Sequence, residues 1–199
     1  MITIRVLAPD ELDAAAALLA EGMRDNPLHL KSFGSDLCRR QRRLRRFLGL
    51  LVAHVHANGT LLGACVDGEL IGVLGMLDSG RCRPTPMETL RMAGAIIVSH
   101  SPTRVWRIHR WLSTWTRNDP SELHAHIGPL AVLPAWRRRG VGRELMMHCC
   151  RRVDAVGVAA WLETDLAINV AFYETLGFAV TRREAVLGVP NWFMRRPSA

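Results

Sequence analysis

The chain has 199 residues, of which 49 % are hydrophobic and 22 % are charged, the balance of an ordinary globular domain. This composition excludes an intrinsically disordered or collagen-like chain. No stretch reaches the ~20 consecutive apolar residues of a membrane-spanning helix, and the N-terminus lacks the basic-then-apolar layout of a signal peptide. We therefore expect one cytoplasmic domain over residues 1–199.

The charge is strongly positive and comes from arginine. The net charge is +8, and Lys31 is the only lysine. This balance is typical of nucleic-acid-binding surfaces and equally of a basic protein with a polyanionic cofactor, so charge alone decides neither. The cysteines form no CxxC pair and no Cys/His metal spacing, which predicts free thiols and no metal site. They are Cys38, Cys65, Cys82, Cys149 and Cys150.

The N-terminal residues predict a strand followed by a helix. Residues 2–7 alternate weakly in hydropathy, as a strand does. Residues 9–23 should be helical, because Pro9 and the acids after it suit the first turn of a helix. Asp25-Asn26-Pro27 should then break the helix.

Residues 35–58 predict a second, longer helix, with apolar residues at helical spacing. Its arginines predict a solvated basic face, although a surface for nucleic acid or an acidic partner is the alternative. These are Arg39, Arg40, Arg42, Arg43 and Arg46. Strands 60–66 and 69–77 should then form a hairpin, because Asp67-Gly68 between two apolar runs favours a tight turn.

The second half of the chain alternates strands and helices. Residues 79–120 are less regular and contain two expected helices, over 87–100 and 102–117, whose tryptophans favour a role in the core. The elements expected after them are strand 122–132, helix 141–156, strand 159–164, helix 168–176, and closing strands 178–186 and 191–195 around the turn 187–190. Strand–helix–strand units after a hairpin predict an α/β fold with one mixed sheet.

The loop between strand 122–132 and helix 141–156 predicts an anion site. Free N–H groups at a helix N-terminus, together with the helix dipole, attract phosphate. Gly140 and Gly142 have no side chain to block its approach, and the arginines nearby add positive charge. A tight turn with exposed arginines is the other interpretation. The pattern is neither a dinucleotide fingerprint nor a Walker loop.

At this point the sequence resembles the GNAT superfamily of N-acetyltransferases. Arg137-x-x-Gly140-x-Gly142 is similar to that family's R/Q-x-x-G-x-G/A signature, and residues 169–178 resemble its second landmark, a helix with a tyrosine followed by Gly-Phe. The resemblance covers residues 122–180 closely and residues 1–78 only in the order of elements. Residues 79–120 have no counterpart and form a helical insertion before the central strand.

The resemblance implies a GNAT acyl-CoA N-acyltransferase fold, in which a mixed, mostly antiparallel sheet is flanked by helices. It implies acetyl-CoA as co-substrate, with the pantetheine arm between two splayed parallel strands and the pyrophosphate on the loop. Asn169 resembles a polar contact to the cofactor arm, or else caps a helix. The implied cofactor-binding residues are Leu130, Ala131, Val132, Arg137, Arg138, Arg139, Gly140, Val141, Gly142, Arg143 and Asn169.

Three residues are implied as catalytic. Tyr173 matches the position that donates a proton to the leaving thiolate. His126 stands where related enzymes carry a general base, and its ordinary pKa near 6.5 suits that role. His124, on the same strand face, could complete a water-linked proton path. Glu122 is a lesser candidate, and ordinary half-buried strand residues are the alternative for both histidines.

The function implied is acetyl transfer to a primary amine of a small molecule, by direct attack in a ternary complex. A protein or peptide amine is the alternative acceptor, and a non-catalytic acetyl-CoA-binding regulator is the alternative class. The insertion is rich in Met and Trp, which suits either an apolar acceptor pocket or a homodimer surface. The absence of a recognised DNA-binding motif disfavours nucleic acid as a partner.

Overall fold

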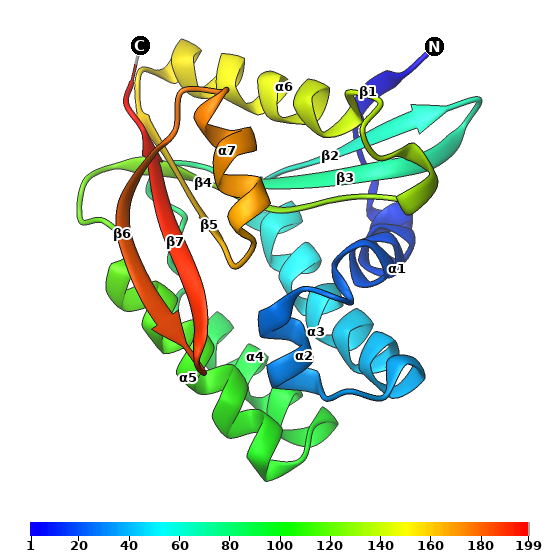
Figure 1. Cartoon of the computed structure of the whole chain (residues 1–199), viewed down its shortest axis with the longest axis vertical. Coiled ribbons are helices and arrows are strands. Elements are labelled where there is room, and N and C mark those ends of the chain that lie inside the picture. The colour runs from blue at the N-terminus through cyan, green and yellow to red at the C-terminus, as the bar shows by residue number, and fades with distance from the viewer. Residues whose placement is uncertain (199) are drawn as a thin grey trace.

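A computed structural model describes residues 1–198. Seven strands form one sheet in the order β1-β2-β3-β4-β5-β7-β6 (Figure 1). The strands are β1 (Thr3–Val6), β2 (Gly59–Val66), β3 (Glu69–Leu77), β4 (His124–Val132), β5 (Ala159–Thr164), β6 (Ala179–Val186) and β7 (Val189–Arg196). The α-helices are α1 (Leu12–Met23), α2 (Pro27–Phe33), α3 (Leu37–Asn58), α4 (Pro86–Ser99), α5 (Pro102–Asn118), α6 (Val141–Val156) and α7 (Ala167–Glu174), with short 3-10 turns η1 (Pro9–Glu11) and η2 (Pro134–Trp136).

The sheet is mixed and mostly antiparallel, which confirms the predicted fold class. Among the strand pairs of residues 1–198, β4 and β5 alone run parallel. Helix α6 makes the crossover between them, as a parallel connection requires. The last turn is shorter than expected, because Leu187 and Gly188 both have positive φ and close a two-residue hairpin between β6 and β7.

Each face of the sheet carries its own hydrophobic core. Neighbouring residues of a strand point to opposite faces, so Leu61 packs with α1 and α3, while Leu62 packs with α6. In Figure 1, α6 and α7 lie on one side of the sheet, and α1, α2 and α3 lie on the other. The central strands are therefore buried on both faces, and functional groups can be reached only where the sheet opens.

Helix α2 was not predicted, because Pro27 was interpreted as a helix breaker and instead begins this helix. The fixed φ of proline suits a first helical position. The cap comes from far along the chain: the Asp165 carboxylate, just after β5, accepts a hydrogen bond from the Leu28 N–H at 2.8 Å. Asn26 also donates to Asp165, at 3.3 Å. The beginning of α2 is thereby attached to the segment that follows β5.

One arginine of the predicted basic face is buried. The Arg40 side chain is 4 % exposed, because it turns inward from α3. Its guanidinium donates to the carbonyls of Arg24, Gly34 and Ser35 and to the Asp25 carboxylate. A buried guanidinium with these partners is satisfied, so Arg40 fixes the connections around α2 rather than serving as a solvated charge.

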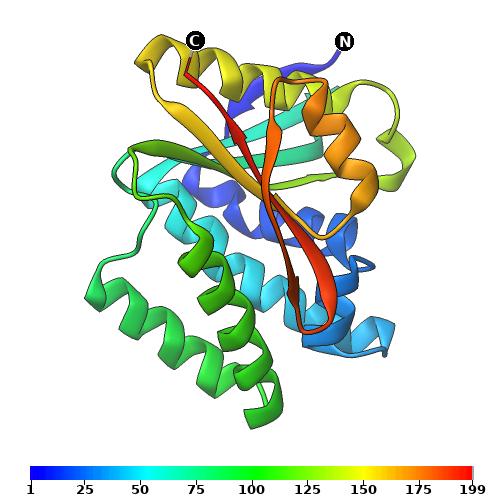
Figure 2. The same cartoon turned by 60° about the vertical axis from the view of Figure 1, so that its left-hand side comes forward.

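Residues 79–120, which the sequence predicts to be a helical insertion, contain the helical pair α4 and α5, which packs in one core with α2 and α3. Figure 2 shows α5 beside the β6–β7 hairpin, where the Trp115 indole N–H donates to Asn191 Oδ1 at 3.1 Å. Trp111 is in the core as predicted, but Trp106 is 57 % exposed. No helix in the described part of the chain combines the length and the apolar character needed to cross a membrane.

Candidate active site

The two parallel strands pair only at their beginnings. β4 and β5 are in register at His124↔Ala159, Ala125↔Ala160 and His126↔Trp161, and within residues 1–198 no pair follows. Beyond His126, the β5-facing edge of β4 therefore has no strand partner. The gap that opens between the strands is the splay that the sequence resemblance implies.

A bulge in β4 lies at the start of this gap. Met76 of β3 pairs with Ile127 and Leu74 pairs with Leu130, so Gly128 and Pro129 stand opposite Gly75 alone. A Cβ on Gly75 would lie 2.6 Å from the Gly128 carbonyl oxygen, so the position must be glycine. Because two residues of β4 stand opposite one residue of β3, the strand bends here and turns away from β5.

The predicted pantetheine contacts follow the bulge. Leu130, Ala131 and Val132 pair with β3 on one edge, and lie beyond the last β4–β5 pair on the other. The Ala131 side chain packs against α1, where a Cβ on Gly22 would approach it to 2.7 Å. Their backbone groups on the open edge are placed to bind an amide-containing chain.

The loop before α6 has the geometry of an anion site. Arg138 and Gly140 adopt positive φ, of 58° and 83°. Gly140 is the N-cap of α6 and provides no side-chain hydrogen bond. The first N–H groups of α6, from Val141 onward, consequently have neither an intrahelical partner nor a cap. A phosphate group would satisfy them and would complement the helix dipole.

The arginines of this loop have different roles. Arg137 donates to the Val132 carbonyl and, at 2.7 Å, to the Gly22 carbonyl, so its guanidinium attaches the loop to β4 and α1. Arg139 lies over the Trp136 ring, 5.1 Å from its centroid. Arg143 donates to Thr175 Oγ1 at 3.2 Å. The sequence predicted all of these arginines as charges around the phosphate. The hydrogen bonds of the Arg137 guanidinium to the Val132 and Gly22 carbonyls make Arg137 an anchor of the loop instead.

Helix α7 carries the two other predicted residues to the end of β5. Asn169 lies inside α7, so the alternative that it caps the helix is wrong; the N-cap is Leu166. Its side chain donates to Thr164 Oγ1 at 3.3 Å. Tyr173 is 7 % exposed and packs against Phe172 and Phe178. Burial, and then the negative charge of Asp165, raise the pKa of Tyr173, so its phenol is protonated and can donate.

Both histidines lie in a cluster with two acids, on the face of β4 opposite to Ala125 and Ile127, which pack with α6. His124 Nε2 is 3.0 Å from Asp119 Oδ1, and His126 Nδ1 is 3.8 Å from the same oxygen. His126 Nε2 is 3.0 Å from Glu163 Oε2. Trp161 donates to the other Glu163 oxygen at 2.9 Å. The Glu163 side chain is 2 % exposed and that of His126 is 22 % exposed, so His126 is the member that solvent or a substrate reaches.

The expectation that His126 keeps an ordinary pKa is wrong. Burial lowers the pKa of His126, but the charge of Glu163 and the hydrogen bonds with Asp119 and Glu163 outweigh it and raise the pKa to about 10. Burial likewise lowers the pKa of His124, and hydrogen bonds with Asp119 and Cys82 raise it to about 10. The two acids stabilise the imidazolium form, which is the form a histidine takes after it accepts a proton.

Glu122, the lesser candidate, is not part of this cluster. It precedes β4, and its carboxylate binds the Arg195 guanidinium. The sequence did not single out Asp119 or Glu163. Glu163 could have been found from its place two residues after Trp161, which aligns it with the histidine face of the neighbouring strand. No local pattern indicates Asp119.

The comparisons with known proteins agree with this geometry. The sequence profile of the Acetyltransferase (GNAT) family matches residues 26–178. A histone acetyltransferase HPA2 and related acetyltransferase from Corynebacterium glutamicum is similar in structure, with TM-score 0.75 and 20 % identity, covering 100 % of this chain and 97 % of that chain. Arylalkylamine N-acetyltransferase 2 from Aedes aegypti has TM-score 0.68 and 13 % identity, covering 100 % and 99 %.

A GNAT family acetyltransferase from Brucella melitensis in complex with acetyl-CoA is also similar, with TM-score 0.56 and 15 % identity, covering 100 % of this chain and 89 % of that chain. At these identities the solved structures show the fold, and the profile match over more than half of the chain shows the family. The chain belongs to the GNAT family and is an acetyl-CoA-dependent N-acetyltransferase.

Proposed function

We propose that the enzyme transfers the acetyl group directly from acetyl-CoA to a primary amine of a small molecule, within a ternary complex. The observation that carries this proposal is the divergence of β4 and β5 immediately after the His126↔Trp161 pair. Helix α6, from Val141, packs on the face of the sheet that carries Ala125 and Ile127, and the His126–Glu163 pair lies on the opposite face. A thioester in the gap would meet a cofactor site and a proton acceptor together.

The proposed cofactor site uses backbone more than side chains. The amide N–H groups at the start of α6 bind the pyrophosphate, with Arg138, Arg139 and Arg143 supplying charge around it. The pantetheine arm lies along the open edge of β4, from Leu130 to Val132. Asn169 holds the end of β5 through Thr164 and stands beside the arm.

The reaction proposed is one addition and one elimination. The neutral amine nitrogen forms a bond to the thioester carbonyl carbon, and a backbone N–H near Leu130 stabilises the oxyanion. The C–S bond then breaks, Tyr173 gives its phenolic proton to the departing thiolate, and His126 receives the proton that the amine loses. The products are the acetylated amine and CoA.

The raised pKa of His126 is compatible with this role. A substrate amine arrives as an ammonium ion beside the imidazolium, and because each cation lowers the pKa of the other, both can release their protons to solvent before the neutral amine attacks. Once His126 is neutral, Glu163 stabilises the imidazolium that forms as the amine is acylated. Glu163 thus acts as a positioning residue, as the acid of a catalytic triad does for its histidine.

Replacing Tyr173 by Phe should lower kcat about 10- to 100-fold and leave the KM for acetyl-CoA unchanged. The thiolate is a moderately good leaving group, because thiols ionise near pH 8–9, so an acid assists without being indispensable. Phenylalanine keeps the ring packing against Phe172 and Phe178, and the Tm should therefore stay close to wild type. Steady-state kinetics check this; a loss confined to acetyl-CoA affinity would make Tyr173 a structural contact.

The acceptor is a small amine in our proposal, and a protein amine is the second candidate. Three aromatic side chains that precede β4, those of His29, Phe33 and Trp111, are buried and contact one another, so they belong to the core. The basic surface disfavours polycationic acceptors, because like charges repel. A panel of small amines and peptides, assayed by mass detection of acetylated product, tests the proposal. Bound acetyl-CoA without turnover on any amine would favour a regulatory role.

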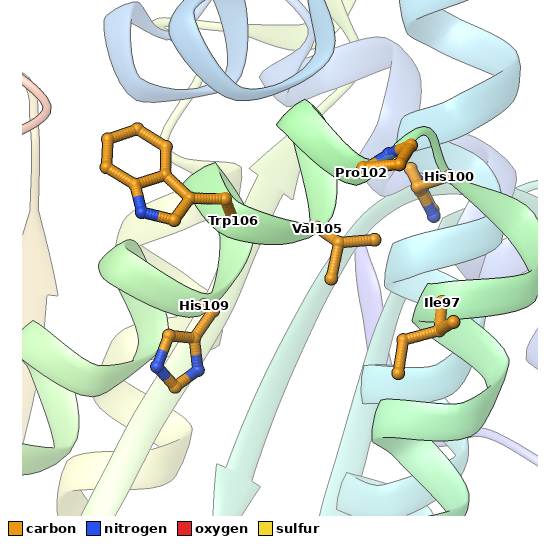
Figure 3. A pocket seen from close by; sticks show the side chains of 6 residues that line it. All are labelled: Ile97, His100, Pro102, Val105, Trp106 and His109. Atoms are coloured by element: carbon orange, nitrogen blue, oxygen red, sulfur yellow. The ribbon is translucent and has the colours of Figure 1, made fainter.

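The proposed insertion, residues 79–120, contains a pocket that is separate from the proposed catalytic residues. A pocket of about 410 Å³ is lined by Ile97, His100, Pro102, Val105, Trp106 and His109. Figure 3 shows these side chains at the end of α4 and the beginning of α5. No candidate catalytic residue lines the pocket. Exposed apolar side chains of α4, such as Leu90 and Val98, support the homodimer prediction, which a solution mass measurement tests. The cytoplasmic location stays a prediction.

A further inference from the structure

We propose that Asp119, His124 and His126 form a binding site for one divalent transition-metal ion of the zinc class. The ligand atoms are Asp119 Oδ1, His124 Nε2 and His126 Nδ1, and all lie within 4.8 Å of one another. A tetrahedral zinc ion with bonds of about 2.0–2.2 Å keeps its ligand atoms roughly 3.3–3.5 Å apart. The distances from Asp119 Oδ1 to His124 Nε2 and to His126 Nδ1, 3.0 and 3.8 Å, bracket that spacing, so small side-chain shifts suffice.

The outer ring nitrogens of both histidines are already held. His124 Nδ1 lies 2.8 Å from the Glu122 carbonyl oxygen, which can only accept, so Nδ1 carries the proton and Nε2 faces Asp119. His126 Nε2 is held by the Glu163 carboxylate at 3.0 Å, and Nδ1 faces Asp119. A carbonyl or a carboxylate behind the imidazole is the arrangement that orients metal-binding histidines.

The third ligand is fixed in the same way. The other carboxylate oxygen of Asp119, Oδ2, accepts from Arg83 Nε at 3.2 Å, which leaves Oδ1 toward the histidines. In their neutral forms, the two imidazole lone pairs and this oxygen would repel one another at these distances. A cation between them removes the repulsion, either as added protons or as a metal ion. Imidazole with carboxylate is a donor set that suits zinc rather than magnesium.

The consequence for the enzyme follows from the shared nitrogen, and rests on the function proposed above for His126. A metal ion on His126 Nδ1 occupies the lone pair that would accept the proton of the amine. The bound ion should therefore inhibit acetyl transfer, and a chelator should restore it. Three protein ligands also leave one position open for water, and the 22 % exposure of His126 provides the route of entry.

The test is metal binding, measured apart from catalysis. Zn²⁺ is titrated against a chromogenic chelator in a Cys38→Ser/Cys82→Ser background, which removes the exposed thiol and the thiol beside His124. We expect one Zn²⁺ per chain, no Mg²⁺ binding, and a Co²⁺ absorption spectrum typical of low coordination number. His124→Ala should abolish binding, while His109→Ala, which removes an exposed histidine of α5, should leave it intact.

A second variant separates ligand loss from misfolding. Glu163→Gln keeps all three ligands and the Trp161 contact but removes the carboxylate behind His126, and should weaken Zn²⁺ binding about 10- to 100-fold. Wild-type Zn²⁺ affinity in folded His124→Ala protein would overturn the proposal, as would no Zn²⁺ uptake by active wild-type enzyme. Stoichiometric Zn²⁺ binding by a protein that acetylates no amine would support the metal site and refute the proposed function.

Discussion

Replacing Gly140 by Asp is expected to weaken acetyl-CoA binding about 100-fold or more, which corresponds to about 3 kcal/mol. Two effects add. Gly140 holds a φ of 83° at the N-cap of α6, and a side chain there costs roughly 1–2 kcal/mol of backbone strain. The new carboxylate would also stand where the pyrophosphate is expected, and contact between like charges costs several kcal/mol. The measurement is equilibrium titration with acetyl-CoA.

The matched control is the same substitution at the other end of the same helix. Gly157 caps α6 at its C-terminus with a φ of 73°, and nothing lies within 4 Å of a Cβ there. Gly157→Asp should cost comparable stability, seen as a lower Tm, while it leaves acetyl-CoA affinity at the wild-type value. Folded Gly140→Asp protein with unchanged affinity would show that the loop does not bind the pyrophosphate.

The geometry of the loop before α6 was predictable because its physics is local. The pattern consists of a glycine between a loop and a helix, with arginines next to it. All of its residues lie within Arg137–Gly142. The apolar runs on either side of Asp67-Gly68 located β2 and β3, and the helical spacing of apolar residues located α6, to within about two residues of their observed ends. In these segments the residues that determine the structure are neighbours in the chain.

The cluster of histidines and acids was predictable only in part, because it is assembled from separate segments. His124 and His126 share a strand face, which a sequence reveals. Asp119 comes from the end of the α5 segment and Glu163 from β5, and only the parallel pairing of β4 with β5 brings Glu163 to His126. The cap of α2 by Asp165 is a similar case. The register in which two distant strands pair is not indicated by the residues next to either strand in the sequence.

The same cluster gives the second large effect: His126→Ala should lower kcat by a factor of about 10² to 10⁴, the usual contribution of general base catalysis. The KM for acetyl-CoA should change little, because His126 lies on the face of β4 opposite to the one that packs with α6. Kinetics with the acceptor amine found in the panel, with acetyl-CoA varied, provide the measurement.

The His126→Ala variant leaves the buried Glu163 carboxylate without its cationic partner, and a control must separate this effect from the loss of the base. Glu163, 2 % exposed, would lose its cationic partner, and an unpaired buried carboxylate costs about 3–5 kcal/mol of stability. The double variant His126→Ala/Glu163→Gln removes that charge and keeps the Trp161 hydrogen bond to the side chain at position 163. If the folded double variant is as slow as predicted, instability is not the cause and the proton acceptor has been lost. A kcat within threefold of wild type would instead assign proton acceptance to water or to His124, which shares this face of β4 and lies 3.0 Å from Asp119.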